Sequence, residues 1–400
     1  MSGPVRFGIL GCGGIGRWHG RMIRSLPGLE LACVADTDES RSARMARSFR
    51  VATRSPEELL EGRDVEVVCV CTPPSTHAPL IEAAARHAKH VLVEKPMTLD
   101  LAEADRVISL CERRGVLLGV VHQHRARSAT RALRALIAGG ALGKLRMASV
   151  IHTWRRAAPD AGPDSWRGVV EMGGGVLLDQ AVHAIDLLVW FLGRPLWASG
   201  STAARDDGPA GEDTVVAALG FDGGALATLA TSQATNRRRD DIAIEVAGSL
   251  GWFRLEIRDY DHAEITGLEL ARSEARRAEA LSSAAIESLI RGQDGSWRRG
   301  PRSLPWRGLS LFAGKERGAH PFRSVRGLAR RRADIVAQRE TREPQGHAAI
   351  LAAMAEAVRG RGHPIVSGRD ARWSIAAIDA LRRSRIEAGR QIDLDSVAIS

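Results

Sequence analysis

Three ionisable side chains interrupt an otherwise apolar helical pattern over Val176 to Leu192. Asp179, His183 and Asp186 recur at positions i, i+4 and i+7, which places them within about 60° of one another on a helical wheel. Burying three such groups on one face is costly unless they line a cavity or have partners. The spacing therefore indicates either a cavity in which an imidazole and carboxylates handle protons, or a buried seam of satisfied Asp and His pairs.

A second candidate is Lys95, one of only four lysines among 57 cationic residues. It stands in the run Glu94-Lys95-Pro96, at the end of the apolar strand pattern from His90. An ammonium group there can reach a substrate hydroxyl and can lower the pKa of a neighbouring acid. The alternative is a solvated lysine at the end of a strand.

The turn over residues 11–16 reads Gly-Cys-Gly-Gly-Ile-Gly, between a strand pattern and a helical one. Such a turn can hold a pyrophosphate at the N-terminus of the helix. Asp36 ends the next strand pattern, 20 residues after Gly16, where a carboxylate accepts hydrogen bonds from a ribose diol and repels a 2′-phosphate. We expect NAD rather than NADP, with contacts from Gly11, Gly13, Gly14, Ile15, Gly16 and Asp36. Asp36 could instead be an ordinary strand-end or helix-capping carboxylate.

The run Cys71-Thr72-Pro73-Pro74-Ser75-Thr76-His77 follows the next buried strand pattern. Its place at the carboxyl edge of a parallel sheet is where ligands bind in this architecture. Two prolines fix the loop, although a strand-to-helix connector capped by Ser75 or Thr76 fits equally well. Further cofactor contacts are predicted at Thr72, Pro73, Pro74, His77, Glu94 and Lys95.

Alternating strands and helices must position these residues. Apolar runs at Val5–Leu10, Leu29–Asp36, Val65–Thr72, His90–Glu94 and Leu117–His122 alternate with helical patterns, which is typical of a parallel α/β sheet. A helix over Ala129–Ile137, a strand over Leu145–Trp154 and the helix over Val176–Leu192 follow. Strand patterns then begin at Trp197, Thr214, Ala225, Ile242 and Trp252 without helices between them. We predict a Rossmann domain at 1–122 and an α+β domain at 123–400 with an open, mostly antiparallel sheet.

The segment 271–343 is predicted to be an insertion before C-terminal helices over 347–388. It holds 17 Lys and Arg against 8 Asp and Glu, so most of the net charge of +10 is local. Helical pieces are expected at 278–290 and 325–339. The segment could be a lid or an oligomer-contact arm, or it could select an anionic substrate. Nucleic-acid or membrane binding is disfavoured because aromatic residues are sparse there.

Composition excludes several classes of protein. With 44% hydrophobic and 26% charged residues, the 400-residue chain has the balance of a folded protein. Five cysteines without C-x-x-C spacing suggest neither a disulfide framework nor a zinc ribbon, and no metal site is predicted. No apolar stretch reaches the ~20 residues of a membrane span, and the strand pattern from Val5 leaves no room for a secretory leader. A cytoplasmic protein is expected.

Taken in order, these motifs resemble those of the glucose-fructose oxidoreductase, inositol dehydrogenase and MocA (Gfo/Idh/MocA) family. The glycine turn with His19, the acidic end of the second strand, the C-T-P-P loop, the E-K-P run and the segment G-G-G-V-L-L-D-x-x-V-H-x-I-D carry the resemblance. It spans residues 5–143, 145 to about 256, and 347–394. The resemblance implies a dinucleotide-binding domain and a second domain whose open sheet often forms an oligomer interface, so a homodimer or homotetramer is expected.

The resemblance also implies a catalytic set that falls on Lys95, Asp179 and His183. Gln123 and Arg125 match a loop near the nicotinamide, and we assign tentative substrate contacts to Arg125, Trp166 and Asp186. Ala126 replaces an aromatic residue frequent after that arginine. The expected reaction is oxidation of a secondary hydroxyl on a sugar, sugar derivative or cyclitol. His183, with an ordinary pKa near ~6.5, would be the base, Lys95 would stabilise the alkoxide, and Asp179 would orient substrate or lysine.

Two other functions fit the same residues. An NAD-dependent glycosidase would oxidise the sugar, eliminate the aglycone and return the hydride. A dinucleotide-binding sensor would bind the cofactor without turnover, although the joint presence of Lys95, Asp179 and His183 argues against it.

Overall fold

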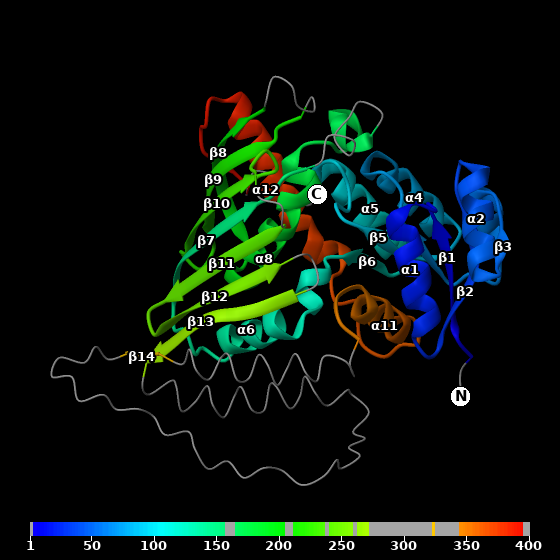
Figure 1. Cartoon of the computed structure of the whole chain (residues 1–400), viewed down its shortest axis with the longest axis horizontal. Coiled ribbons are helices and arrows are strands. Elements are labelled where there is room, and N and C mark those ends of the chain that lie inside the picture. Colours follow the sequence, from blue (N-terminus) through cyan, green and yellow to red (C-terminus); the bar gives the residue numbers. More distant parts are fainter. Residues whose placement is uncertain are drawn as a thin grey trace, which may run out of the picture.

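The computed structural model describes residues 3–156, 165–204, 211–236, 240–258, 262–271, 322–324 and 344–394. Both helical pieces expected within 271–343 lie outside the described residues. The described chain forms two sheets with helices packed against them (Figure 1).

The first sheet has six parallel strands and confirms the expected Rossmann architecture. Their spatial order is β3 (Ala52–Thr53), β2 (Leu29–Ala35), β1 (Val5–Leu10), β4 (Val67–Val70), β5 (His90–Glu94) and β6 (Leu118–Val121). The order reverses between β1 and β4, where dinucleotides bind in such folds. The helices that connect the strands are α1 (Gly14–Ser25), α2 (Glu39–Phe49), α3 (Pro56–Glu61), α4 (His77–Arg86) and α5 (Leu101–Arg114). Only β3 was not expected, because a two-residue strand leaves no pattern in the sequence.

The second sheet has nine strands and is mostly antiparallel, as predicted. The order is β14 (Phe322–Ser324), β13 (His262–Ala271), β12 (Gly251–Arg258), β11 (Asp241–Gly248), β7 (Leu145–Thr153), β10 (Leu226–Ser232), β9 (Thr214–Phe221), β8 (Pro195–Ala203) and β15 (Ile392–Asp393). Its central pair, β7 and β10, is parallel. The edges of this sheet do not close on each other, so it is open.

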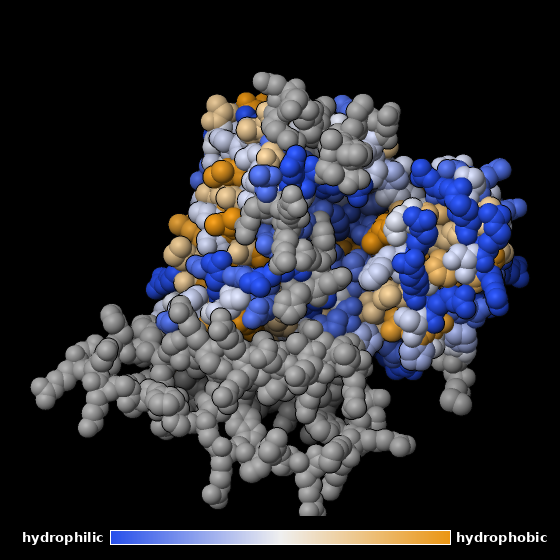
Figure 2. All heavy atoms as spheres, in the orientation of Figure 1, coloured by the Kyte–Doolittle hydropathy of each residue, from blue (hydrophilic) through white to orange (hydrophobic). Residues whose placement is uncertain are grey.

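One face of this sheet is covered by helices and the other is exposed. Helices α8 (Val182–Leu192) and α12 (Gly368–Ile386) pack against the sheet and against each other, and α6 (Ser128–Ala138) lies on β12 and β13. On the other face, large apolar side chains of the central strands are more than half exposed: Met147, Ile151, Val216 and Leu226. Figure 2 shows apolar patches over these strands.

The predicted helix over Val176–Leu192 begins with a π-helical turn, Leu177–Ala181, before α8. Its first N–H groups are held by Glu212, whose backbone oxygen accepts from Val176 and whose side chain accepts from Leu177. The wider turn changes the angular spacing of Asp179 relative to the residues of α8.

Within the described residues, the stretch Val170–Leu192 is long and apolar enough for a membrane span, but 94% of its most apolar window is buried inside the fold.

The chain returns to the first domain near its C-terminus. Helix α11 (Gly346–Val358) packs against α1, and its Leu351 and Met354 share one buried cluster with Phe7 and Ile9 of β1. Figure 1 shows α11 beside α1. The proposed domain of residues 123–400 therefore contributes a helix to the core of the Rossmann sheet.

Candidate active site

The glycine turn after β1 leaves open space at the start of α1. A Cβ at Gly11, whose φ is +96°, would lie 2.4 Å from the carbonyl oxygen of Cys71, and one at Gly16 would lie 1.9 Å from that of Gly11. At Gly13 and Gly14 a Cβ would meet no described atom within 4 Å. Helix α1 has no side-chain cap and no acidic residue in its first turn. Its free N–H groups and the open glycine surface suit the pyrophosphate of a dinucleotide.

Asp36 lies directly beside this turn. Its Oδ2 accepts a 2.7 Å hydrogen bond from the backbone N–H of Cys12, and its Oδ1 accepts one from that of Asp38. The exposed Arg41 pairs with Asp38 rather than with Asp36. The half-buried carboxylate of Asp36 is thus fixed at the end of β2, and Ile15 of the turn packs partly against the core. This arrangement fits the adenosine ribose of NAD.

His77 joins the two loops that follow β4 and β5. Its Nδ1 lies 2.7 Å from the carbonyl oxygen of Pro96, and its Nε2 lies 2.9 Å from that of Thr72. Burial lowers the pKa of His77, although both carbonyl contacts oppose that shift. The Thr76 hydroxyl bonds back to the oxygen of Pro73, which closes the 3-10 turn at Pro74. His77 therefore holds the backbone of the loops that follow β4 and β5.

Lys95 and Asp179 meet although they are 84 residues apart in the chain. The ammonium of Lys95 donates to the backbone oxygen of Asp179 and lies 3.9 Å from its Oδ1. Two arginines that the sequence analysis missed also contact this carboxylate. Arg156 forms an ion pair with Oδ2, and Arg167 Nε lies 3.6 Å from Oδ1. Burial lowers the pKa of Lys95, against the charges of Asp179 and Glu94.

The imidazole of His183 lies beside a second one, that of His124. The ring centroids are 4.9 Å apart, and both side chains are buried. Neither ring nitrogen of either residue has a hydrogen-bond partner among the described residues. Burial lowers the pKa of each imidazole well below its usual value, and the charge of Lys95 adds to this at His183. The pKa of His183 is therefore lower than the ordinary value we expected. The two ring nitrogens of His183 and the two of His124 could bond to a polar ligand.

Asp186 of α8 has a different set of partners. Arg125 binds it through two hydrogen bonds of 2.8 and 2.6 Å, and both residues are buried. His122 Nδ1 lies 3.6 Å from the same carboxylate, while burial lowers the pKa of His122 to about 4. Asp179 and Asp186 of the expected polar stripe thus have different partners, and His122 links the two groups because its ring centroid lies 6.4 Å from that of His183. Because Arg125 and Asp186 neutralise each other, their predicted contact with substrate is not needed to satisfy their charges.

Gln123 and Trp166 are the two remaining predicted contacts. The Oε1 atom of Gln123 is buried without a hydrogen-bond partner in the described part of the chain. The ring of Trp166 is half-buried, and the guanidinium carbon of Arg167 lies 4.3 Å from its centroid. The substrate role of Trp166 stays a prediction.

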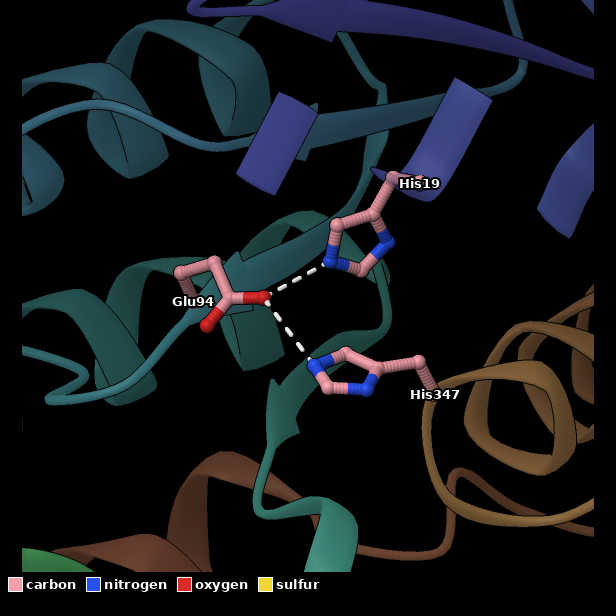
Figure 3. A group of neighbouring side chains, drawn as sticks. All are labelled: His19, Glu94 and His347. Carbon is pink, nitrogen blue, oxygen red and sulfur yellow. Dashed lines mark hydrogen bonds and ion pairs between the residues drawn. The ribbon is translucent and has the colours of Figure 1, made fainter. Parts of the chain in front are cut away.

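Glu94 is held between two histidines from distant parts of the chain (Figure 3). His19 Nε2 of α1 lies 2.7 Å from Glu94 Oε1, and His347 Nε2 of α11 lies 3.9 Å from the same atom. Burial alone would raise the pKa of Glu94, but the hydrogen bond to His19 and the charges of His19, His347 and Lys95 lower it to about 2. Among the described residues this group has the ligand types and closeness to hold a metal ion. The shortest contact in this group, between His19 and Glu94, is already a hydrogen bond. That bond holds Glu94, the residue next to Lys95, in place.

Two family models match the chain. One, described as an oxidoreductase family with an NAD-binding Rossmann fold, matches residues 5–122. The other, the GFO/IDH/MocA C-terminal domain, matches residues 130–254. Together they cover the first sheet and the central strands of the second, and they include Lys95, Asp179 and His183.

Curated relatives include dehydrogenases and reductases. The chain is 31% identical to myo-inositol 2-dehydrogenase of Thermotoga maritima, over 62% of this chain and 74% of the relative. It is 34% identical to dTDP-3,4-didehydro-2,6-dideoxy-alpha-D-glucose 3-reductase of Streptomyces violaceoruber, over 50% of this chain and 58% of the relative. Among solved structures, the WlbA dehydrogenase of Bordetella pertussis in complex with NADH and UDP-GlcNAcA has a TM-score of 0.75 at 23% identity, covering 98% of each chain. That likeness confirms the fold.

Proposed function

Because the chain belongs to the Gfo/Idh/MocA family of NAD-dependent oxidoreductases, we propose that it oxidises a secondary hydroxyl of a sugar, sugar derivative or cyclitol. The main support is the contact of Lys95 with Asp179, together with the effect of the Lys95 charge on His183, whose ring nitrogens have no partner among the described residues. The inositol dehydrogenases among its relatives support the substrate class.

NAD, when bound at the glycine turn, supplies the hydride acceptor for the C–H of the reacting carbon. The neutral His183 takes the hydroxyl proton as the C–H bond breaks and the C=O bond forms. Lys95 holds the hydroxyl oxygen and stabilises the negative charge that develops on it. Asp179 keeps the ammonium in place, because it contacts Lys95 through both its backbone oxygen and its carboxylate.

The test is a panel of polyols, inositols, hexoses and sugar nucleotides incubated with purified protein and with NAD or NADP. We expect net reduction of NAD, seen as absorbance near ~340 nm, and a slower reaction with NADP because Asp36 repels a 2′-phosphate. Glycoside cleavage without net reduction would instead identify an NAD-dependent glycosidase. Cofactor binding without turnover on the whole panel would identify a sensor. Either outcome contradicts the proposal.

We also propose that the chain forms a homodimer through the exposed face of its second sheet. Register places Leu226 beside Met147, and a line from Val216 through Ala230 to Ile151 crosses three strands. The side chains of Met147, Ile151, Val216 and Leu226 are each more than half exposed. A contiguous apolar face of this kind is typical of protein interfaces.

The cytoplasmic location stays a prediction.

A further inference from the structure

We propose that Arg156 and Arg167 form an anion-binding subsite next to Lys95 and Asp179, so that the substrate carries a carboxylate or phosphate group. This inference rests on the proposed dehydrogenase function and adds the chemical class of its substrate. It draws on the residues around Asp179 and not on the basic segment 271–343.

The first support is an excess of positive charge around one carboxylate. Lys95, Arg156 and Arg167 all contact Asp179, whose side chain is only 3% exposed. The side chains of Lys95 and Arg156 are 15% and 9% exposed, so water stabilises these charges poorly. The charge of Glu94 also acts on Lys95, whereas Arg156 and Arg167, the latter 36% exposed, share Asp179 as their one acidic partner among the described residues. Such charges are costly to bury unless an anion joins them.

Three other acidic groups of the described chain form their shortest contacts outside this pair of arginines, although the charge of Glu94 also acts on Lys95. Each already has a cationic or imidazole partner: Glu94 has His19, Asp186 has Arg125, and Asp240 has His152. Those contacts are 2.6 to 2.7 Å long, shorter than the 3.6 Å between Arg167 and Asp179. Among the described residues, Asp179 alone forms ion pairs with Arg156 and Arg167.

The second support is that both guanidinium groups are held in place by other residues. Arg156 Nε donates to Gln233 Oε1 at 2.7 Å, and its guanidinium carbon lies 5.9 Å from the ring centroid of Trp154. Arg167 lies over the ring of Trp166, and its buried Nε has no hydrogen-bond partner in the described part of the chain. Planar groups fixed in this way recognise carboxylate and phosphate oxygens through paired hydrogen bonds.

A simpler role would be that the two arginines only hold Asp179 in place. The two roles have different kinetic consequences. Loss of a positioning residue would lower turnover of neutral and anionic substrates alike. Loss of an anion subsite would raise KM selectively for anionic substrates, because only they use the guanidinium.

The experiment compares wild-type protein with Arg167→Gln and Arg167→Lys on matched substrates, with NAD. The neutral compounds are glucose and myo-inositol, and the anionic ones are glucuronate, glucose 6-phosphate and UDP-glucose. Arg155→Gln is the matched control, because Arg155 is exposed and bonds to Asn236 outside this cluster. We expect wild-type protein to prefer one of the anionic compounds. Arg167→Gln should lower kcat/KM for it about 30-fold or more, through KM, with a smaller loss for neutral compounds.

Calorimetric titration of the NADH-loaded protein with the same five compounds keeps the inference testable without turnover. Tighter binding of glucuronate, glucose 6-phosphate or UDP-glucose in wild type than in Arg167→Gln supports the subsite, and the preferred compound identifies the anion. Equal binding of neutral and anionic compounds would mean that the protein itself neutralises the arginines, which overturns the inference. Equal loss of activity on both substrate classes also overturns it. Selective anion binding without turnover of any compound would contradict the proposed function and leave the subsite standing.

Discussion

Burial lowers the pKa of both Lys95 and His183, but the two side chains respond differently. A lower pKa makes His183 neutral over a wider range of pH, so it remains able to accept a proton. The same shift brings the loss of charge from Lys95 closer to neutral pH. Both effects follow mainly from removal of the charged form from water.

The pH dependence of turnover follows from these directions. kcat/KM should rise with pH as His183 loses its proton, with the acidic midpoint below the ordinary imidazole value of 6.5. It should fall again as Lys95 is deprotonated, with the alkaline midpoint below 10.5. A profile of kcat/KM against pH measures both limbs. An acidic midpoint at or above 6.5 would contradict the role of His183.

Replacement of Lys95 by arginine tests the need for a compact ammonium. Lys95→Arg keeps the positive charge but changes its geometry and removes its ability to share a proton. We expect kcat to fall about 100-fold or more, while the protein still binds NADH. Lys144→Arg serves as control because Lys144 is exposed and far from these motifs in sequence. Undiminished turnover in Lys95→Arg would remove this residue from the mechanism.

The sequence was informative about residues within motifs and less so about their partners. Lys95, Asp179 and Asp36 could be singled out because each stands at a defined place beside a strand or helix pattern. Arg156, Arg167 and His124 could not, because only tertiary packing brings them to Asp179 and His183. Among 57 cationic residues, nothing local distinguishes an arginine that will meet a buried carboxylate.

At the scale of elements, His77 connects the first turn of α4 to the loop that carries Lys95. The neutral His77 ring donates its one N–H to the carbonyl oxygen of Thr72 or of Pro96 and packs between the two, so His77→Ala would remove this bond and loosen both loops. We expect the free energy of unfolding to fall by about 2 kcal/mol and NADH affinity and kcat to decrease. Urea unfolding and NADH titration measure these effects. His87→Ala, at an exposed position just beyond the same helix, should change neither, and an unaltered His77→Ala protein would contradict the proposed link.

The sequence patterns predicted the fold class and most strands. Continuous apolar runs, alternating apolar residues and amphipathic helices are all local properties of the chain. The π-helical turn at Leu177–Ala181 was not predicted. A shift from i+4 to i+5 hydrogen bonding leaves the apolar pattern of a fully buried helix unchanged. At the start of this wider turn, Glu212, which is distant in sequence, accepts a hydrogen bond from the backbone N–H of Leu177. Asp179 and Asp186 also have different partners, because residues seven apart lie about two helical turns from each other even on one stripe.

At the scale of the whole molecule, the exposed sheet face makes a prediction about assembly. Ile151→Lys combined with Val216→Lys would place two charges on the line of apolar side chains across β7, β10 and β9. We expect wild-type protein to be dimeric by light scattering and the double variant to be monomeric with an unchanged circular dichroism spectrum. Ile386→Lys alters an 83% exposed isoleucine outside the sheet and should remain dimeric. A monomeric wild-type protein would contradict the proposal.

The packing of α11 against α1 has a consequence for how the protein is made. A ribosome that has released the first 122 residues has produced all six strands of the parallel sheet, but not the helix that covers Phe7 and Ile9 from the far end of the chain. That apolar surface stays uncovered until more than 200 further residues have been translated. Folding of the nucleotide-binding unit is therefore completed only after α11 has been translated, and a nascent chain stalled before α11 would expose an apolar surface to which chaperones bind.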